Sequence, residues 1–434
     1  MRRRKVSRFA PYALRLMLYA LRFTLYALRS RGWPKRSRGQ NLGAACPAKG
    51  IRMRENFTLE EMSLCRPLAF KPDLRDYPWG KRVRDSNILR WLGVVEESEG
   101  EVVVDGRALE ELGLTLSSPV AECWMASDDA VYPSVVVLDA KTERPFNDLL
   151  QMYPEELLGA AHVQRYGSSL GVMGKLLDTH ADRTIGVLSA QVHPPEAYPD
   201  RPPKPEAWVA LESSGAYLGF SREVDPDELI PALERGDYDL LHKVDMRPGD
   251  VVMVRGGMFH ALLDNSFVFE VSVAPIVGQM QDIRRASVRA YDGWYGRRSR
   301  ETEPEEAIDI IREADGFKKI EAQEVLYTPD ILWEDAEGNR VEQLVRTTGF
   351  VLERMIVETE LRISFMGGGY PVFAVEGTVA VRLPNGTEMD EILRGEYRFI
   401  PACLASLEGD LVFVSLEGPA RVLRWRVPLN KEKA

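Results

Sequence analysis

The sequence predicts a mainly β protein with a few helices, in which short strands from distant parts of the chain fold into β-barrels. Three observations support this fold class. Runs of β-branched residues bounded by turn-forming residues recur after residue 66, as in Ser134–Leu138 and Gly186–Ser189. A Pro-Gly-Asp turn inside Met246–Val254 leads directly into another such run. Strand-like segments return beyond Tyr327, which indicates a second β domain.

The first 52 residues differ from the rest of the chain. They hold 14 of its 56 Lys and Arg residues and no Asp or Glu, and the tetrapeptide Tyr-Ala-Leu-Arg begins at positions 12, 19 and 26. A basic heptad repeat of this kind is compatible with an amphipathic helix on an anionic membrane, or with a targeting peptide poor in acidic residues. We expect instead that residues 1–52 come from translation at an upstream start and are not part of the fold. Met53 is then the natural first residue.

The remaining chain is predicted to form two domains, at residues 53–300 and 301–434. In the first domain strand-like runs surround two expected helices, Asp148–Leu158 and Asp225–Leu241. The second domain opens with an expected helix at Pro304–Ala314. A proline near the start of two of these helices suits the first helical turn, where the backbone N–H has no intrahelical partner.

The composition is that of a globular enzyme and argues against several other classes of protein. Hydrophobic residues make up 45% of the chain, which is enough for a sizeable core, and the net charge of −10 argues against nucleic-acid binding. The four cysteines have no C-x-x-C spacing, which indicates neither a thiolate zinc site nor a disulfide framework and fits a reducing cytoplasm. The sequence contains no run of 18 or more apolar residues, and we therefore expect no membrane-spanning helix.

Two of the five histidines lie in short segments that contain possible metal ligands. Gln191 and His193 are two residues apart, and on a β-strand such residues point to the same face of the sheet. Glu206 and His260 can complete a set of four nitrogen and oxygen donors. Such a set suits zinc or another divalent metal, with a coordination position left open for a substrate.

The segments around these residues resemble the type I phosphomannose isomerases of the cupin superfamily, whose metal motifs read L-S-x-Q-V-H-P, G-K-x-E-x-W and G-x-x-H-A. The resemblance covers about residues 67 to 300, and proline stands at position 203 where the family prefers glycine. The matching segments are Leu188–Pro194, Pro203–Trp208 and Gly257–Ala261, with weaker matches at Trp79–Lys81, Glu122–Trp124 and Lys175–Asp178.

The resemblance implies cupin jelly-roll barrels, of which the first binds one Zn²⁺ or other divalent ion through Gln191, His193, Glu206 and His260. No histidine follows His260 in the sequence, so the second barrel is expected to be metal-free and to have a structural role. The implied reaction interconverts mannose 6-phosphate and fructose 6-phosphate through an enediol, which requires a metal and an acid–base group.

The resemblance also implies three catalytic residues. Lys204 stands two positions before Glu206, matches the family's lysine, and is expected to carry the proton, because a nearby divalent cation lowers the pKa of a lysine. Val288–Asp292 is similar to the family segment Y-R-x-Y-D, although it begins farther beyond Glu270 than in the family, and the glutamine of the family's E-x-Q is absent. Arg289 is expected to neutralise enediolate or phosphate charge, and Asp292 to orient a catalytic side chain.

Other interpretations of these residues stay open at this point. Lys204 is also compatible with a surface position in a proline-rich loop, and Arg289 and Asp292 with a surface ion-pair cluster. The altered motifs leave room for a metal cupin that acts on another sugar, for an oxygenase, or for a non-catalytic carbohydrate-binding cupin. The expected partner is a small sugar phosphate, without nucleic acid or membrane, and the expected assembly is a monomer or a homodimer.

Overall fold

The structure is a computed structural model that describes residues 64–429, except 99, 140, 181–188, 197, 200, 275–286, 292–301, 365–366 and 405–409. Three sequence expectations therefore lie wholly or mostly outside the described residues: the nature of residues 1–52, the strand at Gly186–Ser189 and the position of Asp292. Within the described part, no helix is both long and apolar enough to span a membrane.

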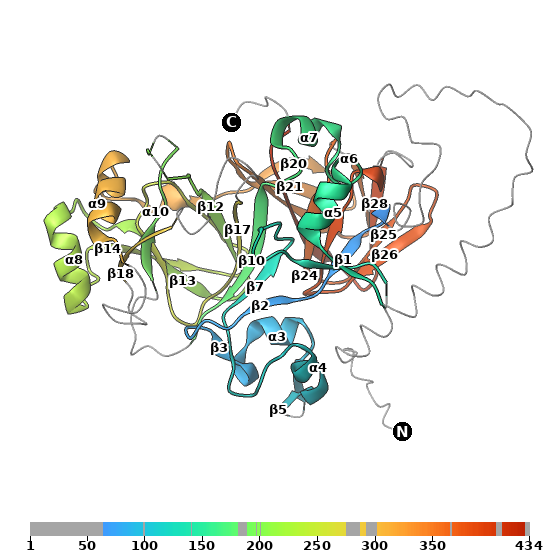
Figure 1. Cartoon of the computed structure of the whole chain (residues 1–434), viewed down its shortest axis with the longest axis horizontal. Helices are drawn as coiled ribbons and strands as arrows, with labels where there is room; N and C mark the ends of the chain where they lie inside the picture. Colours follow the sequence, from blue (N-terminus) through green and yellow to red (C-terminus); the bar gives the residue numbers. More distant parts are fainter. Residues whose placement is uncertain are drawn as a thin grey trace, which may run out of the picture.

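The predicted fold class is confirmed, because the chain forms two barrels of antiparallel strands that lie side by side (Figure 1). In the first barrel a seven-stranded sheet packs face to face on a five-stranded sheet. The larger sheet runs β19 (Leu326–Tyr327), β15 (Val251–Val254), β12 (Glu206–Ala210), β17 (Phe267–Val273), β10 (Val172–Asp178), β7 (Glu122–Met125) and β2 (Asp73–Arg75). The smaller sheet runs β14 (Leu241–Met246), β13 (Ser214–Phe220), β16 (His260–Leu262), β11 (Ala190–Val192) and β18 (Val288–Tyr291).

The second barrel pairs a nine-stranded sheet with a four-stranded sheet around its own apolar cluster. The larger sheet runs β20 (Asp330–Glu334), β21 (Arg340–Arg346), β22 (Val351–Val357), β29 (Ala420–Arg426), β24 (Tyr370–Glu376), β27 (Tyr397–Ile400), β1 (Leu68–Phe70), β8 (Val135–Val137) and β9 (Glu143–Pro145). The smaller sheet runs β23 (Glu360–Ser364), β28 (Asp410–Ser415), β25 (Val379–Arg382) and β26 (Glu388–Ile392). Two further sheets have two strands each: β3 (Lys81–Arg82) pairs with β6 (Pro119–Val120), and β4 (Val95–Ser98) pairs with β5 (Glu101–Val104).

An aromatic seam joins the two barrels. Phe269 on β17 stacks against Phe373 on β24, with ring centroids 5.6 Å apart, and contacts Trp425 on β29 at 5.0 Å. Strands also cross between the barrels: β1, β8 and β9 join the sheet of the second barrel, and β19 joins the first. The division of the chain at residue 300 stays a prediction, and these exchanged strands make each barrel depend on the other for part of its sheet.

The helices lie on the outside of the sheets. Two of the expected helices differ from the observed ones, one by a division at Pro154 and one by an earlier end at Arg235. The described helices are η1 (Val83–Asp85), α3 (Asn87–Trp91), α4 (Gly106–Glu111), α5 (Phe146–Met152), α6 (Pro154–Leu158), α7 (Ala160–Tyr166), α8 (Pro226–Arg235), α9 (Pro304–Glu313) and α10 (Ala322–Val325). The helix expected at Asp148–Leu158 is two helices, because Pro154 begins a new one. The helix expected to reach Leu241 ends at Arg235, where Gly236 adopts a left-handed conformation with φ of 71°.

Helices α8 and α9 cover the outer face of the smaller sheet, and the contacts with them show which strand residues point outward. Their apolar side chains pack on Ala190 and Val192 of β11, Ala261 of β16, and Val288 and Ala290 of β18. Alternate residues on a strand point to opposite faces. The residues between these positions therefore point into the barrel, and they include three that the sequence predicts to be functional.

Candidate metal centre

Three predicted site residues lie in one row across the smaller sheet of the first barrel. Gln191 on β11 is directly opposite His260 on β16 and, on its other side, opposite Arg289 on β18. Directly opposite residues of antiparallel strands project to the same face of the sheet. All three side chains therefore point into the barrel, away from the helices, as the two-residue spacing of Gln191 and His193 predicts for the metal side.

Three of the four predicted metal ligands meet in a buried cluster. His193 Nε2 lies 3.1 Å from Glu206 Oε2, and His260 Nε2 lies 3.7 Å from Glu206 Oε1. All three residues are at most 1% exposed, and their potential ligand atoms lie within 4.8 Å of one another. Metal bonds of ~2.0–2.2 Å in a tetrahedral site place donor atoms roughly 3.3–3.6 Å apart. The separations of both histidine nitrogens from Glu206 are close to this spacing, so the cluster could hold a metal ion.

The hydrogen bonding of His260 supports this interpretation. Its Nδ1 lies 2.9 Å from the carbonyl oxygen of Met258, so Nδ1 carries the proton and Nε2 presents its lone pair. Nε2 is buried and has no hydrogen-bond partner among the described residues. Burial and the neighbouring His193 lower the pKa of His260 to about 4, which keeps the ring neutral at pH 7. A neutral imidazole whose buried nitrogen lacks a partner is a fitting metal ligand.

Glu206 supplies the negative charge of the centre. Burial on its own would raise the pKa of this carboxyl, but Lys204 and His193 outweigh burial and hold the pKa well below its usual range. Glu206 lies on β12 with its side chain on the same face as Trp208, inside the barrel. The neighbouring Ser272 is directly opposite Glu206, and its buried hydroxyl also has no partner among the described residues. The centre thus offers polar atoms that the described side chains do not satisfy.

Lys204 is part of the buried site and not of a surface loop. It is 5% exposed, and its Nζ lies 2.5 Å from Glu206 Oε2 and 3.4 Å from Glu270 Oε1. The two-residue spacing from Glu206 thus places both side chains in one volume, as the sequence predicts. The surface interpretation of Lys204 is wrong, while its catalytic role stays a prediction.

One further pair of site residues, Lys175 and Glu270, is not expected as partners from the sequence. They are directly opposite on β10 and β17, and Lys175 Nζ lies 3.2 Å from Glu270 Oε1. Burial would lower the pKa of Lys175, but Glu270 and Glu122 outweigh it and raise the pKa above its usual value. The oxygen of Glu270 therefore faces two ammonium groups, Lys175 and Lys204. The register of β10 on β17, which sequence alone does not fix, creates this contact.

The weaker motif at Lys175–Asp178 has a structural role at its far end. Asp178 is fully buried, accepts a hydrogen bond from the backbone N–H of Asn87 at 2.6 Å, and lies 3.3 Å from Lys81 Nζ. It therefore anchors the start of α3 to β10 and pairs with the lysine of the Trp79–Lys81 motif. Gly80, the middle residue of the Trp79–Lys81 motif, has no space for a side chain, because a Cβ atom there would lie 2.4 Å from the backbone nitrogen of Ala121.

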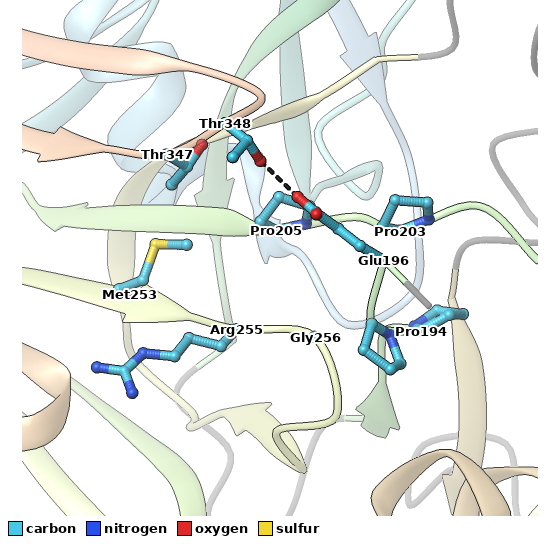
Figure 2. A pocket seen from close by; sticks show the side chains of 10 residues that line it. Pro194, Glu196, Pro203, Pro205, Met253, Arg255, Gly256, Thr347 and Thr348 are labelled. Atoms are coloured by element: carbon cyan, nitrogen blue, oxygen red, sulfur yellow. Dashed lines mark hydrogen bonds between the residues drawn. The ribbon is translucent and has the colours of Figure 1, made fainter. Parts of the chain in front are cut away.

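A small pocket is lined by residues next in sequence to His193 and Lys204, and Figure 2 shows their side chains. Its volume is about 180 Å³, and prolines that adjoin these two residues form much of its wall. Thr348, from the turn between β21 and β22, donates a hydrogen bond of 2.5 Å to Glu196 across the pocket (Figure 2). The lining residues are Pro194, Pro195, Glu196, Pro203, Pro205, Met253, Arg255, Gly256, Thr347 and Thr348. The second barrel thus contacts the loop that follows the predicted metal ligand His193.

Comparisons with known proteins agree with this geometry. No protein-family model matches the chain. It is 29% identical over 170 residues to a mannose-6-phosphate isomerase of Ogataea parapolymorpha, and 25% identical over 291 residues to the mannose-6-phosphate isomerase ManA of Bacillus subtilis. These alignments cover 36% and 65% of this chain. They span about a third (35%) of the first relative's length and 75% of the second's.

Solved structures cover more of the chain. A phosphomannose isomerase mutant of Salmonella typhimurium superposes with a TM-score of 0.61 at 16% identity and covers 83% of this chain and 99% of its own. The mannose 6-phosphate isomerase of Bacillus subtilis superposes with a TM-score of 0.58 at 19% identity, over 83% and 100% of the two chains. The chain has the phosphomannose isomerase fold. The resemblance inferred from the three metal motifs is confirmed.

Of the two remaining predicted catalytic residues, the structure places Arg289 and does not describe Asp292. Arg289 is on the inward face of β18, one strand from Gln191, which fits a role near the centre. Asp292 lies outside the described residues, and so does most of the insertion between Glu270 and Arg289. The role of each residue stays a prediction, and so does the place of Gln191 as the fourth ligand.

Proposed function

We propose that this protein is a metal-dependent aldose–ketose isomerase that interconverts mannose 6-phosphate and fructose 6-phosphate through an enediol. The observation that carries the proposal is the buried cluster of His193, Glu206 and His260 with the Lys204 ammonium against it. The matched relatives are named mannose-6-phosphate isomerases, which supports the choice of substrate. The cytoplasm is the compartment that we propose.

Gln191, His193, Glu206 and His260 would hold the metal, for which we propose Zn²⁺, one ion per chain. When bound, a divalent ion supplies Lewis-acid stabilisation of the negative charge that develops on the substrate oxygens. The residues prepare the site for such an ion: His260 presents a neutral nitrogen that has no hydrogen-bond partner in the described part of the chain, and Glu206 stays ionised. Their burial excludes water, which strengthens each electrostatic contact.

Isomerisation also requires a group that moves a proton between C1 and C2 of the open-chain sugar. We assign this role to Lys204, whose Nζ is held between the carboxylates of Glu206 and Glu270. Lys175 holds Glu270 from the other side, so Glu270 and Lys175 act as positioning residues. Arg289 would neutralise charge on the enediolate or the phosphate, and Asp292 would orient a neighbouring side chain.

The test is a turnover assay on the purified full-length protein with mannose 6-phosphate, in which formation of fructose 6-phosphate is measured. One sample is stripped with a chelator, and a second is stripped and then given one equivalent of zinc. We expect turnover only in the zinc-restored sample. Turnover of unphosphorylated mannose alone would assign the site to another sugar, and binding of mannose 6-phosphate without turnover in any sample would indicate a carbohydrate-binding protein.

A further inference from the structure

A pair of cysteines lies at the edge of the second barrel, away from the metal centre. Cys65 lies three residues before the start of β1, and Cys403 lies three residues after the end of β27. The Cys65 side chain is the first cause of the raised pKa of the Cys403 thiol, which places the two side chains next to each other. Cys403 is also 3.7 Å from the carbonyl oxygen of Leu64, the neighbour of Cys65. Two thiols more than three hundred residues apart in the sequence are therefore neighbours in the fold.

The strand register explains why these two residues meet. β1 pairs antiparallel with β27, with Leu68 opposite Phe399. Cys65 and Cys403 lie just beyond this paired end, in the bend before β1 and the turn after β27. A disulfide bond requires Cα atoms roughly 4.4–6.8 Å apart, and the contact of the Cys403 sulfur with the backbone next to Cys65 is compatible with that spacing. The turn that carries Cys403 is fixed, because Ala402 donates a backbone hydrogen bond of 2.8 Å to Leu157.

The surroundings favour a disulfide over a metal site. Among the described residues, the only group of three or more potential metal-ligating side chains is the one at His193, so none supplies a third ligand beside the two thiols. Access is asymmetric: Cys403 is 7% exposed, whereas Cys65 is half-buried. The hydrogen bond with Cys65 and burial raise the pKa of the Cys403 thiol. Cys65 is therefore the thiol that an oxidant in solution reaches first.

We propose that Cys65 and Cys403 form a reversible disulfide bond that fastens the first strand of the fold to the sheet of the second barrel. The oxidant is a small-molecule disulfide such as oxidised glutathione. The Cys65 thiolate attacks one of its sulfur atoms and releases one glutathione thiolate, which leaves a mixed disulfide on Cys65. Cys403 then loses its proton to solvent, and its thiolate displaces the second glutathione. Two S–H bonds are lost, one S–S bond forms, and one glutathione disulfide is reduced to two thiols.

The position of the bond defines its effect. β1 lies between β27 and β8, so it attaches the hairpin of β8 and β9 to the C-terminal sheet. A cross-link at this seam closes a loop of more than three hundred residues and restricts the unfolded chain. We expect oxidation to raise the melting temperature by about 5 °C.

The experiment treats the full-length protein with oxidised glutathione or with dithiothreitol. It then combines thiol counting under denaturing conditions, intact mass and peptide mapping. We expect the loss of two thiols, a mass lower by two hydrogens, and a linked peptide pair that contains Cys65 and Cys403. Four remaining thiols, a stable glutathione adduct on Cys65, or a link that involves Cys46 or Cys123 would overturn the proposal.

Variants give a second, independent readout. The difference in melting temperature between oxidised and reduced samples is compared within each variant, so a general loss of stability does not affect the result. We expect the difference to vanish in Cys65→Ser and in Cys403→Ala and to persist in the matched control Cys123→Ala, which removes a buried thiol elsewhere. A difference that persists in Cys65→Ser contradicts the proposal even where Cys403→Ala does not fold.

Discussion

The two barrels share an architecture but differ in whether their buried polar and charged side chains are paired with other protein groups. In the first, His193, Glu206 and His260 converge, and His260 Nε2 has no hydrogen-bond partner among the described residues. In the second, the buried charges of Glu353 and Arg424 face each other, with Arg424 Nη2 2.7 Å from Glu353 Oε2. Both lie on the inward faces of β22 and β29, in line with apolar residues of the barrel core.

This difference shows what separates a site from a scaffold in this fold. A barrel interior accommodates ionised side chains when they are paired and hydrogen-bonded, and such pairs have a structural role. A ligand site requires donor atoms that the protein itself leaves unsatisfied. Arg426 adds a second cation 3.6 Å from Glu353, so the carboxylate of the second barrel is enclosed by protein groups. The predictions below test this contrast between the barrels.

The largest expected effect comes from removing a histidine ligand of the first barrel. His193→Ala or His260→Ala should lose the proposed metal and lower the proposed isomerase activity by about 10³-fold or more, because the remaining donors hold a divalent ion weakly. Elemental analysis and the mannose 6-phosphate assay measure the two effects. His242→Ala is the matched control, since this histidine of β14 is outside the cluster. Full metal content in both ligand variants would disprove the assigned centre.

The next effect concerns the second barrel. Glu353→Gln leaves two buried guanidinium groups without their carboxylate, which should lower the free energy of unfolding by about 3–5 kcal/mol. Chemical denaturation measures the loss. Metal content per folded chain should not change, because Glu353 is not part of the metal cluster. If the variant instead loses its metal while its stability is unaffected, the contrast between the barrels is wrong.

A smaller effect separates metal binding from proton transfer inside the first barrel. Lys204→Ala should keep its metal and lower kcat roughly 10²-fold, as expected for a general acid–base group. Glu206→Ala should lose metal first, and activity as a consequence. Lys243→Ala is the control, because Lys243 forms an exposed ion pair with Asp245. A Lys204→Ala protein that turns over at the wild-type rate would pass the acid–base role to Glu270 or Asp292.

The smallest expected effect is at the N-terminus. If residues 1–52 are not part of the fold, as the sequence predicts, a chain that begins at Met53 should keep its melting temperature and its activity. Thermal unfolding and the isomerase assay of both chains provide the comparison. A melting temperature lower by several degrees, equivalent to about 1 kcal/mol or more, would mean that this segment stabilises the folded protein.

The convergence of His193, Glu206 and Lys204 could be predicted from the sequence because its information is local. The spacing of Gln191 and His193 fixes their common face, and Lys204 and Glu206 follow the same rule. The strand segments were predictable for a similar reason, since β-branched runs bounded by turn residues are local signals. The ends of helices were less predictable, because a proline in the middle of an apolar pattern divides α5 from α6.

The contacts that sequence did not reveal depend on pairing between distant strands. Lys175 faces Glu270 because of the register of β10 on β17, and β1 joins the second barrel because it pairs with β27, more than three hundred residues away. Neither contact leaves a periodic pattern in the sequence. The enclosure of Glu353 by Arg424 likewise follows from the pairing of β22 with β29.

One measurement tests the central claim most directly: anomalous X-ray diffraction at the zinc edge from crystals of the full-length protein purified with its metal. We predict one strong peak per chain in the first barrel, about 2.0–2.2 Å from His193 Nε2, His260 Nε2 and a Glu206 oxygen. We predict no peak beside Glu353 and Arg424 in the second barrel. A peak in the second barrel, or none between the two histidines of a fully active enzyme, would contradict the proposed metal centre.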